Sequence, residues 1–248
     1  MKKIITLITD FCSDLYVAQM KGVILSINKE AEIIDIKHNI KSYSLTEGAF
    51  LISQVCLHFP KGSIHLAIID PGVGTFRHSL IIETKNFYFI GPDNGLFSLV
   101  IEKEKIKRII KIDSSRFKES SFTFQGRDIF APVAARISLG EKAENFGKEI
   151  KSIKKLKIRD NSIIYIDNFG NIITNIKKIF PSGKKLIIHY RRKEIKAEFV
   201  RTFADLKKGE FGVLQGSSGY LEIDKNRDSA AKDLRAEIGE RVEVEVKN

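Results

Sequence analysis

Hydrophobic positions in the first half of the chain follow two spacings, one typical of strands and one typical of helices. Continuous apolar runs, as expected of strands covered on both faces, alternate with segments whose apolar residues recur every three or four positions. The predicted strands are 4–9, 32–36, 63–69 and a hairpin over 80–83 and 87–90, and the predicted helices are 16–27, a segment from Ser44, and 128–139. This order predicts an α/β domain with a mainly parallel sheet.

The second half of the chain, after about Gly140, has a different pattern. Charged residues dominate as far as Asn161, and short apolar segments then follow at close spacing, which is typical of small β-barrels and sandwiches. The predicted strands are 163–166, 172–176, 185–190, 194–200, 212–214, 220–223 and 242–246, with a short helix over 230–236. We therefore predict an α/β domain over 1–145, a lysine-rich linker over 146–160 and an all-β, barrel-like domain over 161–248.

Composition places the chain among globular proteins with a sizeable core. Of its 248 residues, 43% are hydrophobic, which is enough for one large domain or two modest ones. The two cysteines, Cys12 and Cys56, are too few for a disulfide framework or a cysteine-based zinc site. The sequence shows no signal-peptide pattern and no apolar segment of bilayer length, so we expect a cytoplasmic protein.

The formal net charge of +11 suggests nucleic-acid binding, because clustered lysine and arginine side chains neutralise phosphates. The basic residues are instead scattered over polar positions. The densest run, 148–159, has no aromatic residues among its lysines that could stack on bases. We therefore expect no nucleic-acid and no membrane partner, and a basic protein that serves RNA or a ribosomal surface is kept only as an alternative.

Two aspartates stand where predicted strands end. Asp10 follows the strand 4–9, and Asp70 follows the strand 63–69 within the stretch AIIDPGVGTFR. Ligands of open α/β sheets bind beyond the carboxyl ends of strands, so both positions suit a binding site. Taken singly, each aspartate is better explained by local structure, Asp10 as a helix cap and Asp70 as part of a tight turn.

Familiar phosphate, metal and nucleophile motifs are absent from the sequence. Gly72 and Gly74 lack the third glycine of a dinucleotide-binding loop, and no P-loop pattern occurs. The five histidines show no metal-ligand spacing, and no G-x-S-x-G element supports a serine nucleophile. No metal and no organic cofactor is therefore expected.

Six polar stretches together carry a resemblance that none of them carries alone. In chain order they are TDFCSDLYVAQMKGVILSIN, DPGVGTFR, GPDNGLFS, TFQGRDIFAPVAA, IDNFGNIITNI and SSGYLEI. In order and spacing they resemble the adenosine-forming S-adenosyl-L-methionine hydrolases, a family related to the fluorinases and chlorinases, and the resemblance spans Ile5 to about Val246. It implies an N-terminal α/β nucleoside-binding domain, a C-terminal β-barrel-like domain, and a homotrimer whose sites lie between the N-terminal domain of one subunit and the C-terminal domain of its neighbour.

The resemblance also implies roles for individual residues. The hydrolases use an aspartate, an arginine and a histidine beside the 5′ carbon; Asp70 and Arg77 match the first two, and Gln125 stands in the place of the histidine. The tight turn would fold Arg77 back onto Asp70, where its planar guanidinium can fix the carboxylate. This acid-centred set points to water, not halide, as the nucleophile. The implied substrate contacts are Asp10 on the ribose hydroxyls, Asp14 at the methionine end, Tyr43 beside the ribose, Phe203 on adenine, Asp167, Asn171 and Ser217 on the amino-acid portion, and Asn226 near the adenine edge.

The sequence departs from the family's pattern at two positions. Cys12 stands where a glycine usually follows TDF, and we expect little cost if the backbone there has a negative φ. The amide of Gln125 can form hydrogen bonds but cannot take up a proton near neutral pH. Two hypotheses follow. In the first, the protein is an enzyme, weakened by Gln125, that hydrolyses S-adenosyl-L-methionine to adenosine and L-methionine by in-line attack of water on the 5′ carbon. In the second, a protein of the same fold binds adenosylmethionine or adenosine without turnover.

Overall fold

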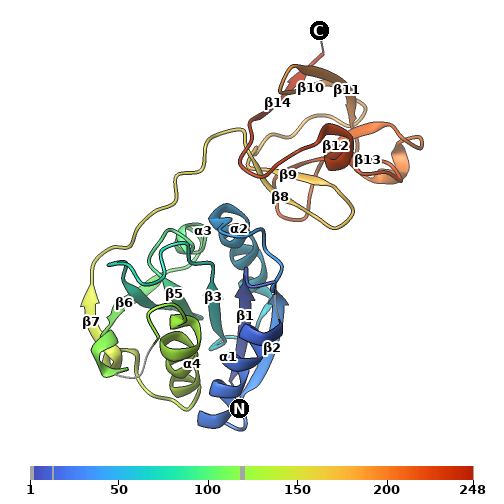
Figure 1. Cartoon of the computed structure of the whole chain (residues 1–248). Coiled ribbons are helices and arrows are strands. Elements are labelled where there is room, and N and C mark those ends of the chain that lie inside the picture. The colour runs from blue at the N-terminus through green and yellow to red at the C-terminus, as the bar shows by residue number, and fades with distance from the viewer. Residues whose placement is uncertain (1–2, 13, 118–120, 248) are drawn as a thin grey trace. The chain divides into compact units, whose positions relative to one another are not determined.

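The chain divides into two compact units, Met1–Leu156 and Lys157–Asn248, each built around its own seven-stranded sheet (Figure 1). The computed structural model describes residues 3–12, 14–117 and 121–247. Within these ranges, no helix combines the length and the apolar character needed to cross a bilayer.

The sheet of the first unit is mixed, with one parallel half and one antiparallel half. From edge to edge its strands are β2 (Glu32–Lys37), β1 (Ile4–Thr9), β3 (Ile64–Ile68), β5 (Tyr88–Pro92), β4 (Ser79–Thr84), β6 (Ile106–Ile112) and β7 (Gly147–Ile150). The first four run parallel to one another, whereas every pairing from β5 to β7 is antiparallel. The prediction of a mainly parallel sheet is therefore correct for only half of it, because β4 and β5 form a hairpin and the strands beyond β4 continue antiparallel.

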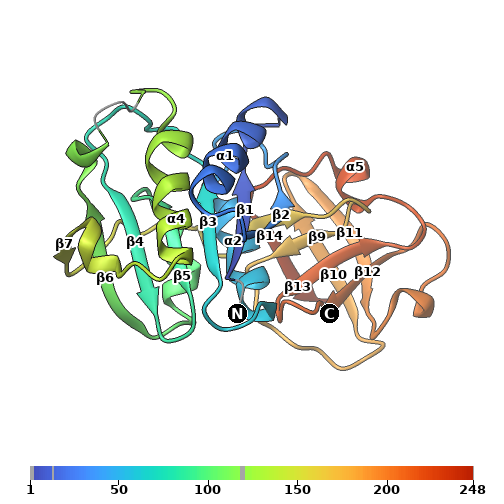
Figure 2. The ribbon, with the colours of Figure 1, turned by 90° about the horizontal axis from the view of Figure 1, so that it is seen from below.

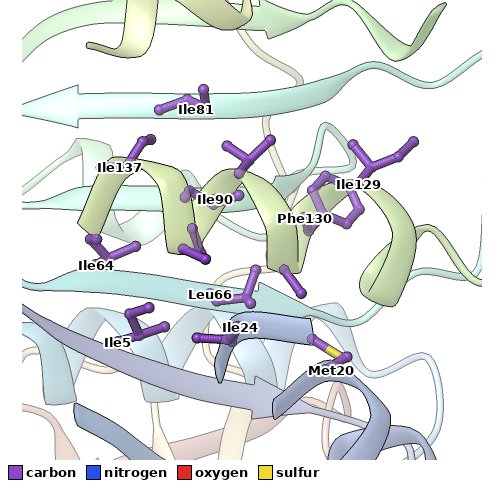
Figure 3. Close-up of a cluster of buried hydrophobic side chains, with 14 of the residues drawn as sticks. Ile5, Met20, Ile24, Ile64, Leu66, Ile81, Ile90, Ile129, Phe130 and Ile137 are labelled. Carbon is purple, nitrogen blue, oxygen red and sulfur yellow. The ribbon is translucent and has the colours of Figure 1, made fainter. Parts of the chain in front are cut away.

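Helices cover both faces of this sheet. α1 (Asp14–Ile27) and α4 (Ala131–Ser138) pack against each other over one face, as Figure 2 shows, and α2 (Leu45–Val55) and α3 (Ser98–Ile101) pack together over the other. Successive residues of β3 point to opposite faces, so Leu66 joins the cluster under α1 and α4, whereas Ala67 joins the cluster under α2 and α3. Figure 3 shows the cluster under α1 and α4. Because the sheet is buried on both faces, the strand sequences are almost continuously apolar.

The sheet of the second unit curls into a half-barrel. Its strand order is β14 (Val242–Val246), β10 (Lys185–Tyr190), β11 (Lys193–Phe199), β12 (Phe211–Gln215), β13 (Leu221–Lys225), β9 (Ile172–Thr174) and β8 (Ile163–Ile166). The start of β8 is bonded to the segment just before β14: the N–H of Ile163 donates to the carbonyl of Glu240 at 2.9 Å, and the N–H of Gly239 donates to the carbonyl of Ile163 at 2.8 Å. The expected strands are all present, and the expected short helix is α5 (Ala230–Leu234).

Several elements were not anticipated. The segment 146–160, expected as a linker, contains β7. Ile150 and Ile153 pack onto the core under α2 and α3, while Lys151 between them is exposed. The helix expected over 128–139 begins earlier, as a π-helix over Gly126–Phe130 that leads into α4. Short 3₁₀ helices occur at Cys56–His58, Ser114–Arg116, Ala143–Phe146 and Phe203–Asp205.

The backbone at Cys12 corrects the expectation of a negative φ at that position. Its φ is 50°, in the left-handed region, and its N–H donates to the carbonyl of His38 at 2.8 Å. Only glycine adopts this conformation without a steric cost from Cβ. The glycine usual in the family therefore has a structural reason here, and the cysteine is strained.

We expect Cys12→Gly to raise the free energy of unfolding by roughly 0.5–1 kcal/mol, because relief of the left-handed strain exceeds the entropy that glycine loses on folding. Urea unfolding measures the change. Cys12→Ala is the matched control, since it removes the thiol but keeps Cβ, and it should leave stability almost unchanged. An equal gain in both variants would assign the effect to the thiol and contradict the backbone explanation.

Candidate functional site

The candidate site lies at the carboxyl edge of the parallel strands in the first unit. β1 and β3 are parallel neighbours, so Asp10 and Asp70, which follow them, emerge at the same edge. β4 runs antiparallel to β5 and therefore begins at this edge, and Arg77 precedes it by two residues. The topology thus gathers three charged side chains from separate parts of the sequence where ligands of α/β sheets bind.

Asp70 and Arg77 form a buried, two-point ion pair. Nε of Arg77 donates to Oδ1 of Asp70 at 2.9 Å, and Nη2 donates to Oδ2. The exposed fraction is 4% for the Arg77 side chain and 6% for Asp70, so the pair is almost completely removed from water. The N–H of Gly72 donates to the same Oδ1 at 3.3 Å. The tight turn therefore folds Arg77 back onto Asp70, as the sequence predicted.

Gln125 completes the surroundings of the guanidinium. Its Oε1 accepts a hydrogen bond from Nη2 of Arg77 at 2.6 Å, while Nη1 donates to Oγ of Ser79 at 3.1 Å and to the carbonyl of His78 at 3.4 Å. All five N–H groups of the guanidinium thus have acceptors. Because arginine can only donate, residue 125 has to offer it an acceptor. Nε2 of Gln125 has no acceptor among the described residues and remains available at the site.

Asp10 lies beside this pair with part of its carboxylate unused. Its Oδ2 accepts a hydrogen bond from the N–H of Tyr43 at 2.8 Å, so it fixes the connection between β2 and α2. Burial, together with the nearby charge of Asp70, raises the pKa of Asp10 against the opposing effect of backbone hydrogen bonds. The side chain of Tyr43 is 67% exposed. Asp14 is the first residue of α1, and its side chain lies outside the described part of the structure.

A cavity of about 230 Å³ opens among these residues. It is lined by Asp10, Phe11, Ser42, Tyr43, Ile68, Asp70, Val73, Thr123, Phe124, Gln125 and Gly126. Two carboxylates and an amide lie beside aromatic walls, which suits a ligand with hydroxyl groups and an apolar or flat part. No three His, Cys, Asp or Glu side chains in the described ranges lie together in a way that could hold a metal ion.

The loop that carries Gln125 is held by a second ion pair. Arg127 donates to Asp128 from Nε at 2.5 Å and from Nη2 at 3.0 Å, and its Nη1 donates to Gln19 of α1 at 2.9 Å. The N–H of Ser121 donates to Asp128 at 2.7 Å, and the guanidinium of Arg127 lies over the ring of Phe124. These contacts attach the aromatic wall and Gln125 to the packed helices.

The candidate residues of the second unit divide between two turns and a cavity. Asp167 accepts from the N–H groups of Phe169 and Asn171 and from Nδ2 of Asn171, each at 2.9 Å, so its carboxylate holds the β8–β9 turn. A cavity of about 550 Å³ is lined by Asn171, Phe203 and Asn226, among others. Ser217 is exposed in the β12–β13 turn and is not among the residues that line this cavity.

Sequence reasoning missed three residues that these sites use. Ser79 accepts from Arg77, and Phe124 forms a cavity wall in edge-to-face contact with Phe11 and Tyr16. Phe169, 80% exposed, lines the second cavity. Phe124 and Phe169 lie inside the quoted motifs TFQGRD and IDNFGN, so an aromatic residue within a polar stretch was the available signal. Ser79 gave none, because it belongs to an ordinary strand.

Two family models match the chain. Residues 5–147 match the SAM hydroxide adenosyltransferase N-terminal domain, and residues 161–243 match the C-terminal domain of the same family. A crystal structure of an uncharacterized conserved protein from Thermotoga maritima is 34% identical, with a TM-score of 0.91, over 97% of this chain and 99% of that one.

Named relatives cover nearly the whole chain. An (R)-S-adenosyl-L-methionine hydrolase from Methanocaldococcus jannaschii is 44% identical over 97% of this chain and 95% of its own length. One of the same name from Thermus thermophilus is 30% identical over 94% and 95%. A fluorinase from Nocardia brasiliensis is 25% identical over 95% and 96%. With both domain models matched in order and a relative this similar over its full length, the chain belongs to the SAM hydroxide adenosyltransferase family.

Proposed function

We propose that this protein is an enzyme that hydrolyses S-adenosyl-L-methionine to adenosine and L-methionine. Its family and its 44% identity to a hydrolase of that name support the reaction. The observation in this chain that carries the proposal is the ordered group of Asp70, Arg77 and Gln125 at a cavity of the first unit. Because the relatives are named for the (R) form, we infer the same preference here.

In the proposed reaction, the oxygen of water forms a bond to the 5′ carbon while the bond from that carbon to sulfur breaks. The electron pair of the broken bond stays on sulfur, so methionine leaves as a neutral thioether, and the attacking water gives up one proton. Because the leaving group is neutral and the sulfonium charge disappears, little acid assistance is needed. Positioning in a site shielded from bulk water then supplies most of the rate effect.

Asp70 orients the attacking water and helps to remove its proton. Its Oδ1 already accepts from Arg77 and Gly72, so Oδ2 has the remaining acceptor position for a water molecule. Arg77 acts as a positioning residue, because its two bonds fix the plane of the carboxylate. Gln125 presents Nε2 to the oxygen of the same water.

Gln125 offers the same pair of groups as a neutral imidazole, namely one acceptor and one N–H donor. Its acceptor is already bonded to Arg77. A histidine at this position would have to turn an unprotonated nitrogen to Arg77 and would keep its proton on the other nitrogen. We therefore infer that residue 125 orients the water and does not relay a proton.

Binding of the substrate involves both units in our proposal. The unit over 1–145 binds the nucleoside through Asp10 and Tyr43 and contacts the methionine end through Asp14. The segment 146–160 connects this unit to the barrel-like unit over 161–248. In that unit, Phe203 and Asn226 contact adenine, and Asp167, Asn171 and Ser217 contact the amino-acid portion. We propose a cytoplasmic homotrimer, in which each site is completed by the barrel-like unit of another subunit.

The reaction itself is tested by incubating the protein with each sulfonium epimer of S-adenosyl-L-methionine and separating the products by chromatography. We expect adenosine and methionine, faster from the R epimer. In heavy-oxygen water, the label should enter the 5′-hydroxyl of adenosine, because water is the nucleophile. Tight binding without any adenosine would refute hydrolysis and leave a binding protein of the same fold.

The role of residue 125 is tested by exchanging its hydrogen-bonding groups. Gln125→Leu should lower the turnover number about a hundredfold or more, because one oriented donor is lost from the reacting water. Gln125→His should stay within about tenfold of the parent, because it keeps one acceptor and one donor. A much larger increase for Gln125→His, with a new ionisation in the pH profile, would show that histidine relays a proton and overturn this inference.

Asp10→Ala should weaken adenosine binding strongly while changing the free energy of unfolding by less than about 1 kcal/mol, since it removes the proposed ribose contact but only one backbone hydrogen bond. Calorimetric titration and urea unfolding measure the two effects. Asp10→Asn retains an acceptor for Tyr43 and should also bind weakly, because the charge is lost. A loss of stability without a loss of binding would assign Asp10 a structural role only.

The trimer is tested by light scattering of the full chain. We expect three copies, because a site shared between subunits leaves a monomer with half a pocket. A monomer that binds adenosylmethionine tightly would contradict the shared site. It would not contradict hydrolysis, which the product assay tests separately.

A further inference from the structure

The motif GPDNGLFS forms a buried turn next to the candidate site, although none of its residues is among those that line the cavity. The motif ends β5, turns and begins α3, and every residue in it except Asn94 is buried. Polar turns usually run over the surface, because buried polar groups need hydrogen-bond partners. The partners of this one, the 93–98 turn, lie at both ends of the segment 70–77 and in the segment that leads to the second unit.

Two consecutive residues of the 93–98 turn hold the two ends of the segment that carries the buried ion pair. Nδ2 of Asn94 donates to the carbonyl of Ile69 at 2.8 Å, and the N–H of Asp93 donates to the carbonyl of His78 at 2.9 Å. Ile69 immediately precedes the aspartate of the ion pair, and His78 immediately follows its arginine. One neighbouring turn therefore closes this segment at its base.

The bond from Asn94 fixes the peptide unit from which Asp70 extends. The carbonyl of Ile69 and the N–H of Asp70 belong to one planar unit, so holding the carbonyl sets the direction in which the chain leaves β3. The amide of Asn94 is itself oriented, because the N–H of Leu96 donates to its Oδ1 at 3.2 Å. The carboxylate at the cavity is thus supported from behind by a second ordered turn.

The bond from Asp93 supports the arginine of the ion pair. The carbonyl of His78 accepts both from the N–H of Asp93, at 2.9 Å, and from Nη1 of Arg77, at 3.4 Å. Holding this carbonyl keeps one acceptor of the guanidinium in place. Both members of the ion pair are therefore supported by the 93–98 turn.

The same turn is bonded to the segment by which the chain passes to the second unit. Oδ1 of Asp93 accepts from the N–H of Lys154 at 2.8 Å, and Oγ of Ser98 accepts from the N–H of Leu156 at 2.7 Å. Gly95 has a φ of 98°, and a Cβ there would lie 2.9 Å from the backbone nitrogen of Leu156, so the close approach requires glycine. Leu156 is the last residue of the first unit. The exit of the chain and the ion pair consequently share one support.

We propose that the 93–98 turn is a positioning element of the reaction. Asn94 and the backbone of Asp93 orient the Asp70–Arg77 pair, and the side chain of Asp93 couples this orientation to the seating of residues 154–156. The inference rests on the proposed function, because the orientation matters for catalysis only if Asp70 acts on the attacking water. None of the turn's residues has to touch the substrate, since a small displacement of a reacting group is enough to slow the reaction strongly.

Asn94→Asp tests the support of Asp70. It keeps the size of the side chain and the acceptor for Leu96, but it replaces the N–H donor to Ile69 by a carboxylate oxygen. We expect the turnover number for S-adenosyl-L-methionine to fall about tenfold or more, while the dissociation constant of adenosine stays within about twofold. The two effects separate because Asp10, the proposed ribose contact, is not bonded to this turn.

Asn28→Asp is the matched control at the opposite edge of the sheet, just before β2. Nδ2 of Asn28 donates to Oγ of Ser138 at 2.8 Å, and its Oδ1 accepts from the N–H of Glu30 at 3.0 Å, so the same two kinds of bond are involved. The control should lose a similar amount of thermal stability and keep the turnover number of the parent.

Hydrogen exchange followed by mass spectrometry gives a readout that needs no activity. The N–H groups of Gly72 and Val73 donate to Asp70, so the exchange rate over 70–77 reports on the order of this segment. Exchange there should be faster in Asn94→Asp than in the parent and unchanged in Asn28→Asp.

The coupling to residues 154–156 is tested at Asp93, where both variants keep the bond of Asn94. Asp93→Ala removes the acceptor of Lys154, and Asp93→Asn keeps an oxygen there. We expect Asp93→Ala to speed exchange over 151–156 and to lower the turnover number about threefold or more, and Asp93→Asn to restore both.

Other outcomes would overturn the proposal in distinguishable ways. If Asn94→Asp and Asn28→Asp lose turnover equally, the effect comes from stability alone. Unchanged exchange over 70–77 in Asn94→Asp would show that the turn does not hold the ion pair. Faster exchange over 151–156 in Asp93→Ala without loss of turnover would refute the coupling. If the parent releases no adenosine, the proposed function fails and the catalytic role of the turn fails with it, whereas the exchange measurement still decides whether the turn orders the ion pair.

Discussion

The contact between Arg77 and Asp70 is the interaction on which the order of the candidate site depends. Two charges are removed from water there, and such a pair is tolerated only when nearly every donor and acceptor is satisfied. Arg77 meets this condition through five hydrogen bonds, to Asp70, Gln125, Ser79 and the carbonyl of His78. Any rotation of the guanidinium would break several of them at once. The carboxylate and the amide at the cavity are consequently oriented by the same rigid group.

The sequence predicted those parts of the fold in which a local pattern determines the outcome. β1, β8, β10 and β14 have the expected bounds, because each is a short apolar or alternating run between polar residues. β6 and β7 were missed, since lysine and arginine side chains on these outer strands interrupt the pattern. The hairpin of β4 and β5 was predicted, but hydrophobic periodicity does not indicate strand direction, so the antiparallel pairing of β6 and β7 beyond it could not be predicted.

The candidate site was predictable where its contacts are close in the sequence. Asp70 and Arg77 are separated by one turn, and the motif itself indicated their contact. Ser79 gave no such signal although it is only two residues from Arg77, because nothing in the sequence distinguishes a serine at the start of an ordinary strand as an acceptor. The strain at Cys12 was also hidden, because a backbone angle depends on where the next element begins, and here the N–H of Cys12 is bonded to His38 after β2.

The closure of the half-barrel also bears on how the second unit is synthesised. Residues 161–163 pair with 239–242, from nearly the opposite end of the unit, so this contact has a very high contact order and a large loop-closure entropy. During translation, β8 leaves the ribosome long before its closing partner exists and presents an unpaired strand edge until then. Residues 239–242 therefore close the β-sheet of the second unit, and a nascent chain stalled before them is prone to aggregate.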